Sequence, residues 1–186
     1  RSGLNDFTVY DTGAPLVQDF KPEFDVETAK SLALKALNVL GQDYVNVLTE
    51  CFENNWIDYY ETENKATGGY EIAVYGVHPY ILLNYQPNYN SLSTLVHELG
   101  HACHSYYSNK HNPIATADYN MFLAEIPSTT NELLLLKYMI TNAKDNKEKL
   151  ISLRVTKNEF ASRTVLKAIE KMRCVGVLKE DPREKL

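Results

Sequence analysis

The sequence lacks the features of membrane-spanning and disulfide-rich proteins. A membrane helix requires roughly 18 consecutive apolar residues, whereas an apolar run such as 133–136 is only one helical turn. Three cysteines, Cys51, Cys103 and Cys174, are an odd number at wide separations, which favours buried reduced thiols over a disulfide framework. No secretory leader is recognised after Arg1, and that start suggests a piece of a longer protein. We therefore expect a cytoplasmic protein without a membrane partner.

The sequence also has no excess of positive charge. Its 19 Lys and Arg residues are outnumbered by 24 Asp and Glu, for a formal net charge of −5. A surface that follows nucleic-acid phosphates would need the opposite balance. No internal repeat or low-complexity tract is present. The remaining composition, 44% hydrophobic over 186 residues, suits one domain with an apolar core.

Two helices are predicted in the first third of the chain. Asp25 is a good N-cap, and the leucines and alanines of 29–40 give the following segment an apolar side. Gly41 should end or kink this helix. A second helix is predicted over 42–54, with apolar residues at helical spacing.

The middle of the chain favours short strands. Aromatic and branched residues gather in 57–60, 70–75 and 80–85, and glycine and proline separate these runs, so we predict two or three strands. A glycine-rich strand beside an active site would let a peptide backbone approach closely. Gly69, Tyr70 and His78 are therefore candidate substrate contacts. For His78 the alternative is a turn histidine that bonds to the backbone.

The pattern returns to helices afterwards. A helix is predicted over 91–108 with Asn90 as N-cap, followed by a loop over 109–117. Asp118 should cap a further helix that runs to Ile140 and is interrupted at Pro127. From Asp145 onward the chain is charged and predicted to be helical. The expected fold class is mainly α with a small β-sheet beside the active-site cleft.

One motif points to metal chemistry. His97-Glu98-Leu99-Gly100-His101 places two histidines four residues apart, which is one face of a helix, so both imidazoles can reach one ion. Glu98 lies at the edge of that face, where it can take a proton from a water molecule at the metal. A chance match on a packed helix is the alternative, at about one in a hundred from composition.

A catalytic zinc ion needs a third protein ligand. A carboxylate from the next helix is the better candidate, and Glu125 and Glu132 are two turns apart on one face. One of them would bind directly and the other would hydrogen-bond to a ligand histidine. Both stand among apolar residues, where an unpaired carboxylate is costly. For His104 we favour a buried hydrogen-bonding role near the site, with core packing as the alternative.

Three segments together resemble a known family. The segments 75–85, 94–107 and 124–132 are similar to those of oligoendopeptidase F, in the thimet-oligopeptidase-like zinc peptidases, and the resemblance covers about residues 8–141. It implies that His97, His101 and Glu125 bind one zinc ion, that Glu98 is the general base and that Glu132 supports a ligand from behind. It also implies a partial zincin-like catalytic domain over 1–141, with 142–186 a helical tail of uncertain relation, and endopeptidase action on short peptides.

The chain departs from this family in two ways. Members of the family are several times longer, and they use a histidine and tyrosines well downstream of the ligand glutamate to stabilise the oxyanion. Here the last histidine is His111 and the last tyrosine is Tyr138, so 142–186 cannot supply these groups. Loss of one oxyanion donor costs a hundredfold or more in rate. We therefore expect slow turnover, and the alternatives are a peptide-binding fragment without catalysis, a zinc carboxypeptidase, or a site that is merely structural.

Overall fold

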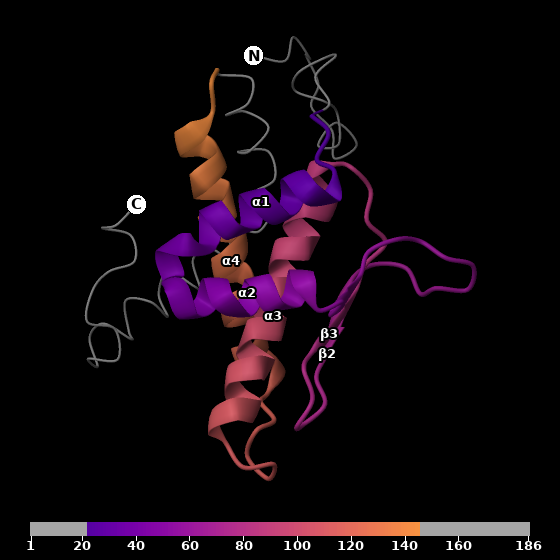
Figure 1. The fold of residues 1–186 in the computed structure, drawn as a ribbon, viewed down its shortest axis with the longest axis vertical. Helices are drawn as coiled ribbons and strands as arrows, with labels where there is room; N and C mark the ends of the chain where they lie inside the picture. Colours follow the sequence, from indigo (N-terminus) through magenta and orange to yellow (C-terminus); the bar gives the residue numbers. More distant parts are fainter. Residues whose placement is uncertain (1–21, 146–186) are drawn as a thin grey trace, which may run out of the picture.

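Four α-helices and a small sheet make up the part of the chain that the computed structural model describes, residues 22–145 (Figure 1). The long helices α3 and α4 run side by side, α1 and α2 pack across them, and the sheet lies beside α3. The elements in chain order are α1 (Val26–Leu37), η2 (Asn38–Leu40), α2 (Gln42–Glu53), β1 (Ile57–Asp58), β2 (Tyr70–Ile72), β3 (Tyr80–Leu82), α3 (Tyr89–His111) and α4 (Met121–Asn142). The prediction of a mainly α fold with a small sheet is confirmed. The division at 141 stays a prediction, because nearly all of the tail lies outside the described residues.

Helix α1 begins where the sequence predicts. The Asp25 carboxylate accepts a hydrogen bond from the backbone N–H of Thr28 at 2.7 Å, which satisfies one of the unpaired donors of the first turn. A single 3-10 turn then leads to Gly41, whose φ of +99° is available to glycine but strained for other residues. This turn lets α2 fold back across the bundle.

The three strands form one sheet in the order β1-β3-β2. β1 is parallel to the central β3, and β2 is antiparallel to it, with Glu71 opposite Ile81. β2 is therefore an edge strand, and within the described residues its outer edge has no strand partner. Both β2 and β3 contact α3, so the free edge lies beside the helix that carries the two-histidine motif.

The predicted ends of α3 and α4 need correction. The N-cap of α3 is Asn88, which accepts from the N–H of Ser91, whereas Asn90 lies inside the helix. The N-cap of α4 is Asn120, which accepts from Leu123 N–H, whereas Asp118 bonds to the adjacent N–H of Tyr119. The extended backbone that a cap requires decides between neighbouring candidates, and the sequence does not reveal it. The predicted loop is displaced to 112–120, because α3 continues to His111 and α4 begins at Met121.

Pro127 does not interrupt α4, contrary to the prediction. The helix runs without a break from Met121 to Asn142. Proline removes its own N–H bond, here the one to the carbonyl of residue 123, and its ring crowds that carbonyl. Packing of α4 against α3 on both sides of Pro127 offsets that loss.

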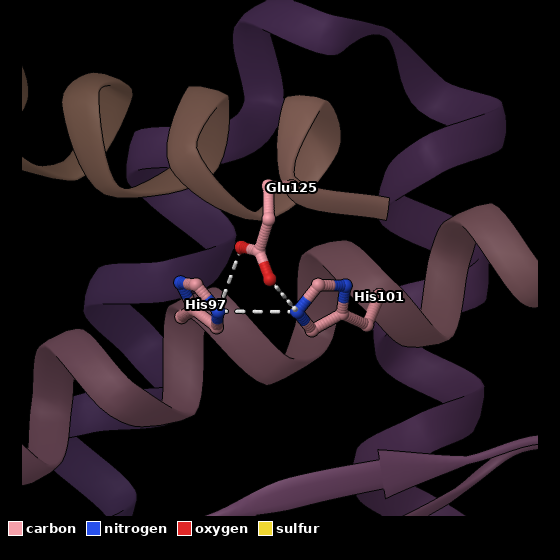
Figure 2. A group of neighbouring side chains, drawn as sticks. All are labelled: His97, His101 and Glu125. Atoms are coloured by element: carbon pink, nitrogen blue, oxygen red, sulfur yellow. Dashed lines mark hydrogen bonds and ion pairs between the residues drawn. The ribbon is translucent and has the colours of Figure 1, made fainter. Parts of the chain in front are cut away.

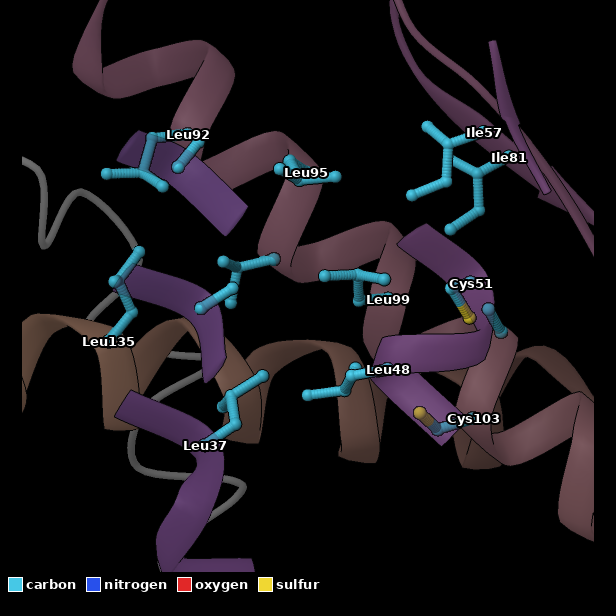
Figure 3. Close-up of a cluster of buried hydrophobic side chains, with 14 of the residues drawn as sticks. Leu37, Leu48, Cys51, Ile57, Ile81, Leu92, Leu95, Leu99, Cys103 and Leu135 are labelled. Carbon is cyan, nitrogen blue, oxygen red and sulfur yellow. The ribbon is translucent and has the colours of Figure 1, made fainter. Parts of the chain in front are cut away.

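The apolar core lies where α1, α2, β1 and β3 meet α3 (Figure 3). Leu92, Leu95 and Leu99 of α3 are fully buried and lie among side chains from α1, α2 and α4. Burying each leucine contributes about 1.5–3 kcal/mol relative to exposure. Cys51 and Cys103 are buried free thiols, as predicted, while Cys174 lies outside the described residues. None of the helices in the described range is long and apolar enough to span a membrane.

Candidate metal centre

Helix α3 presents His97 and His101 on one face. Their Nε2 atoms lie 3.1 Å apart, and the rings meet nearly edge to face. This is the pairing that the four-residue spacing predicts. Two ring nitrogens at this distance leave no room for a protein atom between them, but one ion can lie in front of both.

The Glu125 carboxylate reaches the two imidazoles from the first turns of α4 (Figure 2). Its Oε2 lies 3.4 Å from His97 Nε2 and its Oε1 lies 3.8 Å from His101 Nε2. Zinc–ligand bonds of about 2.0–2.1 Å in tetrahedral geometry place ligand atoms about 3.3 Å apart. The three donor groups therefore converge at distances near those of a zinc site, with a different Glu125 oxygen nearest each imidazole, and they are the one group of potential metal ligands found within the described residues.

A close helix crossing brings Glu125 to the histidines. Gly100 faces the backbone of Pro127 and Ser128, and a Cβ at position 100 would lie 2.5 Å from Ser128 Cα. Real Cβ atoms essentially never come that close to other heavy atoms. Glycine between the two histidines thus allows α4 to approach α3 to the distance that the third ligand needs.

Helix α4 also holds the three donors in orientation. Glu132 Oε1 lies 3.0 Å from His97 Nδ1, so a proton on Nδ1 leaves the Nε2 lone pair free for a metal. The His101 ring hydrogen-bonds to the backbone of Ala124. Ser128 Oγ donates to Glu125 Oε2 at 2.9 Å. One helix therefore supplies the carboxylate and the groups that orient both imidazoles.

The electrostatics of the two histidines differ. Burial acts to lower the pKa of His97, but the hydrogen bond to Glu132 and the nearby carboxylates outweigh it and raise the pKa above 6.5. Burial and the neighbouring His97 lower the pKa of His101. Three carboxylates, those of Glu98, Glu125 and Glu132, surround the two imidazoles. Their negative charge suits a divalent cation.

Glu98 is buried and points toward the strand side of α3. It is 6% exposed, and burial, opposed by His97 and reinforced by Glu71 and Glu125, raises its pKa to about 7. Its Oε1 would lie 3.5 Å from a Cβ built on Gly69. Glu98 thus lies on the side of α3 that faces the start of β2. A general base for a peptide bound along β2 needs this position.

The predicted substrate contacts have different surroundings. Gly69 packs so tightly that a Cβ would lie 2.7 Å from Thr94 Cγ2, and Tyr70 is an exposed residue of the edge strand. Gly69 lies on the side where Glu98 is found, whereas Tyr70 alternates with Glu71 along the strand. His78 instead stacks on Trp56 at 4.7 Å between ring centres, and its Nδ1 lies 2.9 Å from the Pro79 carbonyl. The backbone contact is the one that the alternative for His78 expects, and a contact of His78 with substrate stays a prediction.

His104 lies outside the group of three donors. Its ring stacks on Tyr119 with 4.0 Å between centres, and burial lowers its pKa. Its Nδ1 is buried and has no hydrogen-bond partner among the described residues. The contacts of His104 are therefore those of the packing alternative, and the expected hydrogen bond is not formed at Nδ1.

Two residues that matter for the site were not singled out from the sequence. Asn131 is 1% exposed, donates to the Val96 carbonyl and accepts from Tyr44 Oη, so it ties α2, α3 and α4 together. Ser128 anchors Glu125. Both lie in the segment that resembles the family. A polar residue on an apolar helix face was the available signal, because such residues require buried partners.

Known proteins resemble this chain over most of its length. The sequence profile of Peptidase family M3 matches residues 2–179, beyond the region 8–141 in which the resemblance was seen. Oligopeptidase PepF of Bacillus subtilis is 46% identical over 147 residues, which cover 79% of this chain and 22% of that protein. An oligoendopeptidase F homologue of Mycoplasma genitalium is 43% identical over 134 residues, or 71% of this chain and 22% of the relative. The chain thus spans less than a quarter of the length of these two relatives.

Solved structures agree with this assignment. A protein from Chlamydophila abortus described as a peptidase is 36% identical, with a TM-score of 0.73 over 90% of this chain and 29% of its own. An oligoendopeptidase F from Bacillus anthracis, 22% identical, shares the fold with a TM-score of 0.60 over 75% of this chain and 26% of its own. The resemblance to oligoendopeptidase F is confirmed, and the chain belongs to Peptidase family M3.

Proposed function

We propose that this chain holds one zinc ion between His97, His101 and Glu125 and forms the catalytic part of an endopeptidase for short oligopeptides. The observation that carries the proposal is the convergence of the three donor groups, whose ligand atoms all lie within 4.8 Å of one another. Two nitrogens and one carboxylate are the ligand set of a catalytic zinc site with an open position. The names of the relatives, oligopeptidase and oligoendopeptidase, support the substrate class.

The residues around the ligands have separate tasks in this reaction. When bound, zinc supplies a Lewis acid that polarises a peptide carbonyl and makes water a stronger acid. Glu98 takes the proton of the attacking water and gives it to the leaving amine. Glu132 keeps the proton of His97 on Nδ1, and Ser128 keeps the Glu125 carboxylate in place. The unpaired edge of β2 aligns the peptide through backbone hydrogen bonds.

Metal content tests the first half of the proposal. After dialysis against micromolar zinc, elemental analysis should find one zinc per chain in the wild type and much less in His101→Ala and Glu125→Ala. His111→Ala is the matched control, because His111 is an exposed histidine at the far end of the same helix. Equal zinc in all four proteins would contradict the assigned ligands.

Peptide cleavage tests the second half. With zinc present, mass spectrometry should find internal cuts in short peptides, and Glu98→Gln should abolish them while zinc stays bound. Equal rates for the wild type and Glu98→Gln would exclude catalysis by this chain and leave a zinc-dependent peptide-binding fragment. Products shortened only at the carboxyl end would indicate a carboxypeptidase instead.

A further inference from the structure

A polar cavity lies next to the metal group, between β2 and the second half of α3. Its volume is about 330 Å³, and Ser105 and Asn109 of α3 form one wall. These residues follow His101 by four and eight positions, so they lie about 6 and 12 Å farther along the axis and turn gradually away from the face that carries His101. Tyr75 Oη donates to the Asn112 carbonyl at 3.0 Å and ties the strand side to the end of α3.

The cavity contains a carboxylate with one unpaired oxygen. Glu71 pairs with the core residue Ile81 across the sheet, so its side chain shares the Ile81 face and points toward α3. Its Oε1 is buried and has no hydrogen-bond donor in the described part of the chain. Burial raises the pKa of Glu71, and only a hydrogen bond with Ser105 opposes that shift. A half-buried carboxylate whose inaccessible oxygen has no donor or cation is costly, which points to a partner from outside.

The other lining groups fit a long cationic side chain. The lining includes a second carboxylate, Asp118, but no lysine, arginine or histidine. The hydroxyls of Ser105 and Tyr119 bond to each other at 2.6 Å. Ile72 and Ile114 provide apolar walls, along which the methylene stem of a lysine or arginine can pack while its charged end reaches the carboxylates.

The position of the cavity sets its distance from the reacting bond. A peptide extended along β2 advances about 3.3 Å per residue. A cavity that begins about 6 Å and ends about 12 Å beyond His101 therefore receives the side chain two to four residues from a carbonyl at the metal. Only alternate residues of an extended peptide face α3, so one of these positions should dominate.

We propose that this cavity is a specificity subsite for a lysine or arginine side chain of the peptide, with Glu71 as the group that recognises it. The proposal rests on the proposed function, because it takes the occupant to be a substrate peptide that lies along β2. Glu71 makes a charge-assisted hydrogen bond to the basic side chain, and Asp118 adds a weaker contact at the exposed mouth.

Peptide affinity tests this subsite without requiring turnover. The probes are fluorescein-labelled nonapeptides of alanine with two central phenylalanines, each with one lysine or one glutamine moved through the flanking positions. Fluorescence anisotropy gives their affinities for the zinc-loaded chain that carries Glu98→Gln. Lysine at one position should bind about tenfold tighter than glutamine, the size of a charge-assisted hydrogen bond. Adding Glu71→Gln should reduce that ratio to about twofold or less.

Control variants make the result decisive. Glu63→Gln removes the same charge from an exposed turn outside the cavity and should leave the ratio unchanged. Asp118→Asn, at an exposed position, should lower it by about twofold, and it serves as the test if Glu71→Gln fails to fold. Equal binding of lysine and glutamine peptides at every position, no binding at all, or a ratio that survives Glu71→Gln would overturn the subsite. Loss of cleavage in the parent chain, with the affinity ratio intact, would count against the proposed function alone.

Discussion

Replacing Gly100 by alanine tests whether the close helix crossing creates the metal site. The added Cβ would lie 2.5 Å from Ser128 Cα and 2.8 Å from the Pro127 carbonyl carbon. Both contacts are backbone atoms, which no rotamer change can move away. The distance is about 0.9 Å short of the 3.4 Å at which ordinary contact begins, so α4 has to shift outward by about that amount.

Two opposing effects set the change in stability. Overpacking of a well-packed contact costs about 1–3 kcal/mol, whereas alanine in a helix is favoured over glycine by about 1 kcal/mol. Because the clash involves backbone on both sides, we expect a net loss of about 1–2 kcal/mol in the free energy of unfolding. The effect on zinc affinity should be larger than the effect on stability, because a ligand shift of nearly 1 Å exceeds the tolerance of about 0.2 Å for metal–ligand distances. A drop in zinc affinity of tenfold or more should follow.

Urea unfolding in zinc-free buffer measures the first quantity, and competition with a fluorescent zinc chelator measures the second. Gly41→Ala is the matched control. Gly41 has no atom within 4 Å of its ideal Cβ, but its φ of +99° is strained for alanine, at a cost of about 1–3 kcal/mol. Gly41→Ala should therefore lower stability but leave zinc affinity unchanged. The reasoning would be refuted if Gly100→Ala were as stable as the wild type and bound zinc equally well.

Three further predictions follow from the site and the core. Glu132→Gln should weaken zinc binding about ten- to hundredfold, because His97 loses its charged acceptor; Glu63→Gln, measured by the same competition assay, should not. Leu95→Ala should cost about 2–5 kcal/mol in urea unfolding. Burial raises the pKa of Cys51, and raises that of Cys103 to about 12, from 9.0. Their stabilising contribution is therefore fully present below pH 9.0 and is lost progressively as the pH rises toward the folded-state pKa values, so the unfolding free energy should fall between pH 9 and pH 11; a flat profile would contradict this.

The sequence predicted the helical frame and the paired imidazoles well. Both depend on local spacing: Asp25 precedes an apolar-periodic segment, and four residues separate His97 from His101. A helix turns such spacing directly into geometry. The two candidate carboxylates, Glu125 and Glu132, were also found this way, since two turns of one helix keep them on one face. The structure places Glu125 at both imidazoles and Glu132 at His97 Nδ1.

Contacts between distant segments could not be read in the same way. The stacking of His78 on Trp56 and of His104 on Tyr119 joins parts of the chain whose relative position no local pattern specifies. The exact caps depend on backbone torsions that neighbouring Asn and Asp residues satisfy equally well in sequence. Pro127 was misjudged because its lost hydrogen bond is local, while the packing that offsets it is tertiary.

The Asn131 amide has a consequence for the site before any metal arrives. It spans from the Val96 carbonyl to the Tyr44 hydroxyl, and the Asn131 side chain is almost fully buried. If α4 slid along α3 by one turn, these polar groups would be buried unpaired, at about 1–3 kcal/mol each. The slide is therefore disfavoured in the empty protein, and Glu125 stays level with the imidazoles. The ligands are therefore preorganised before the ion binds, and little of its binding free energy is lost to aligning the two helices.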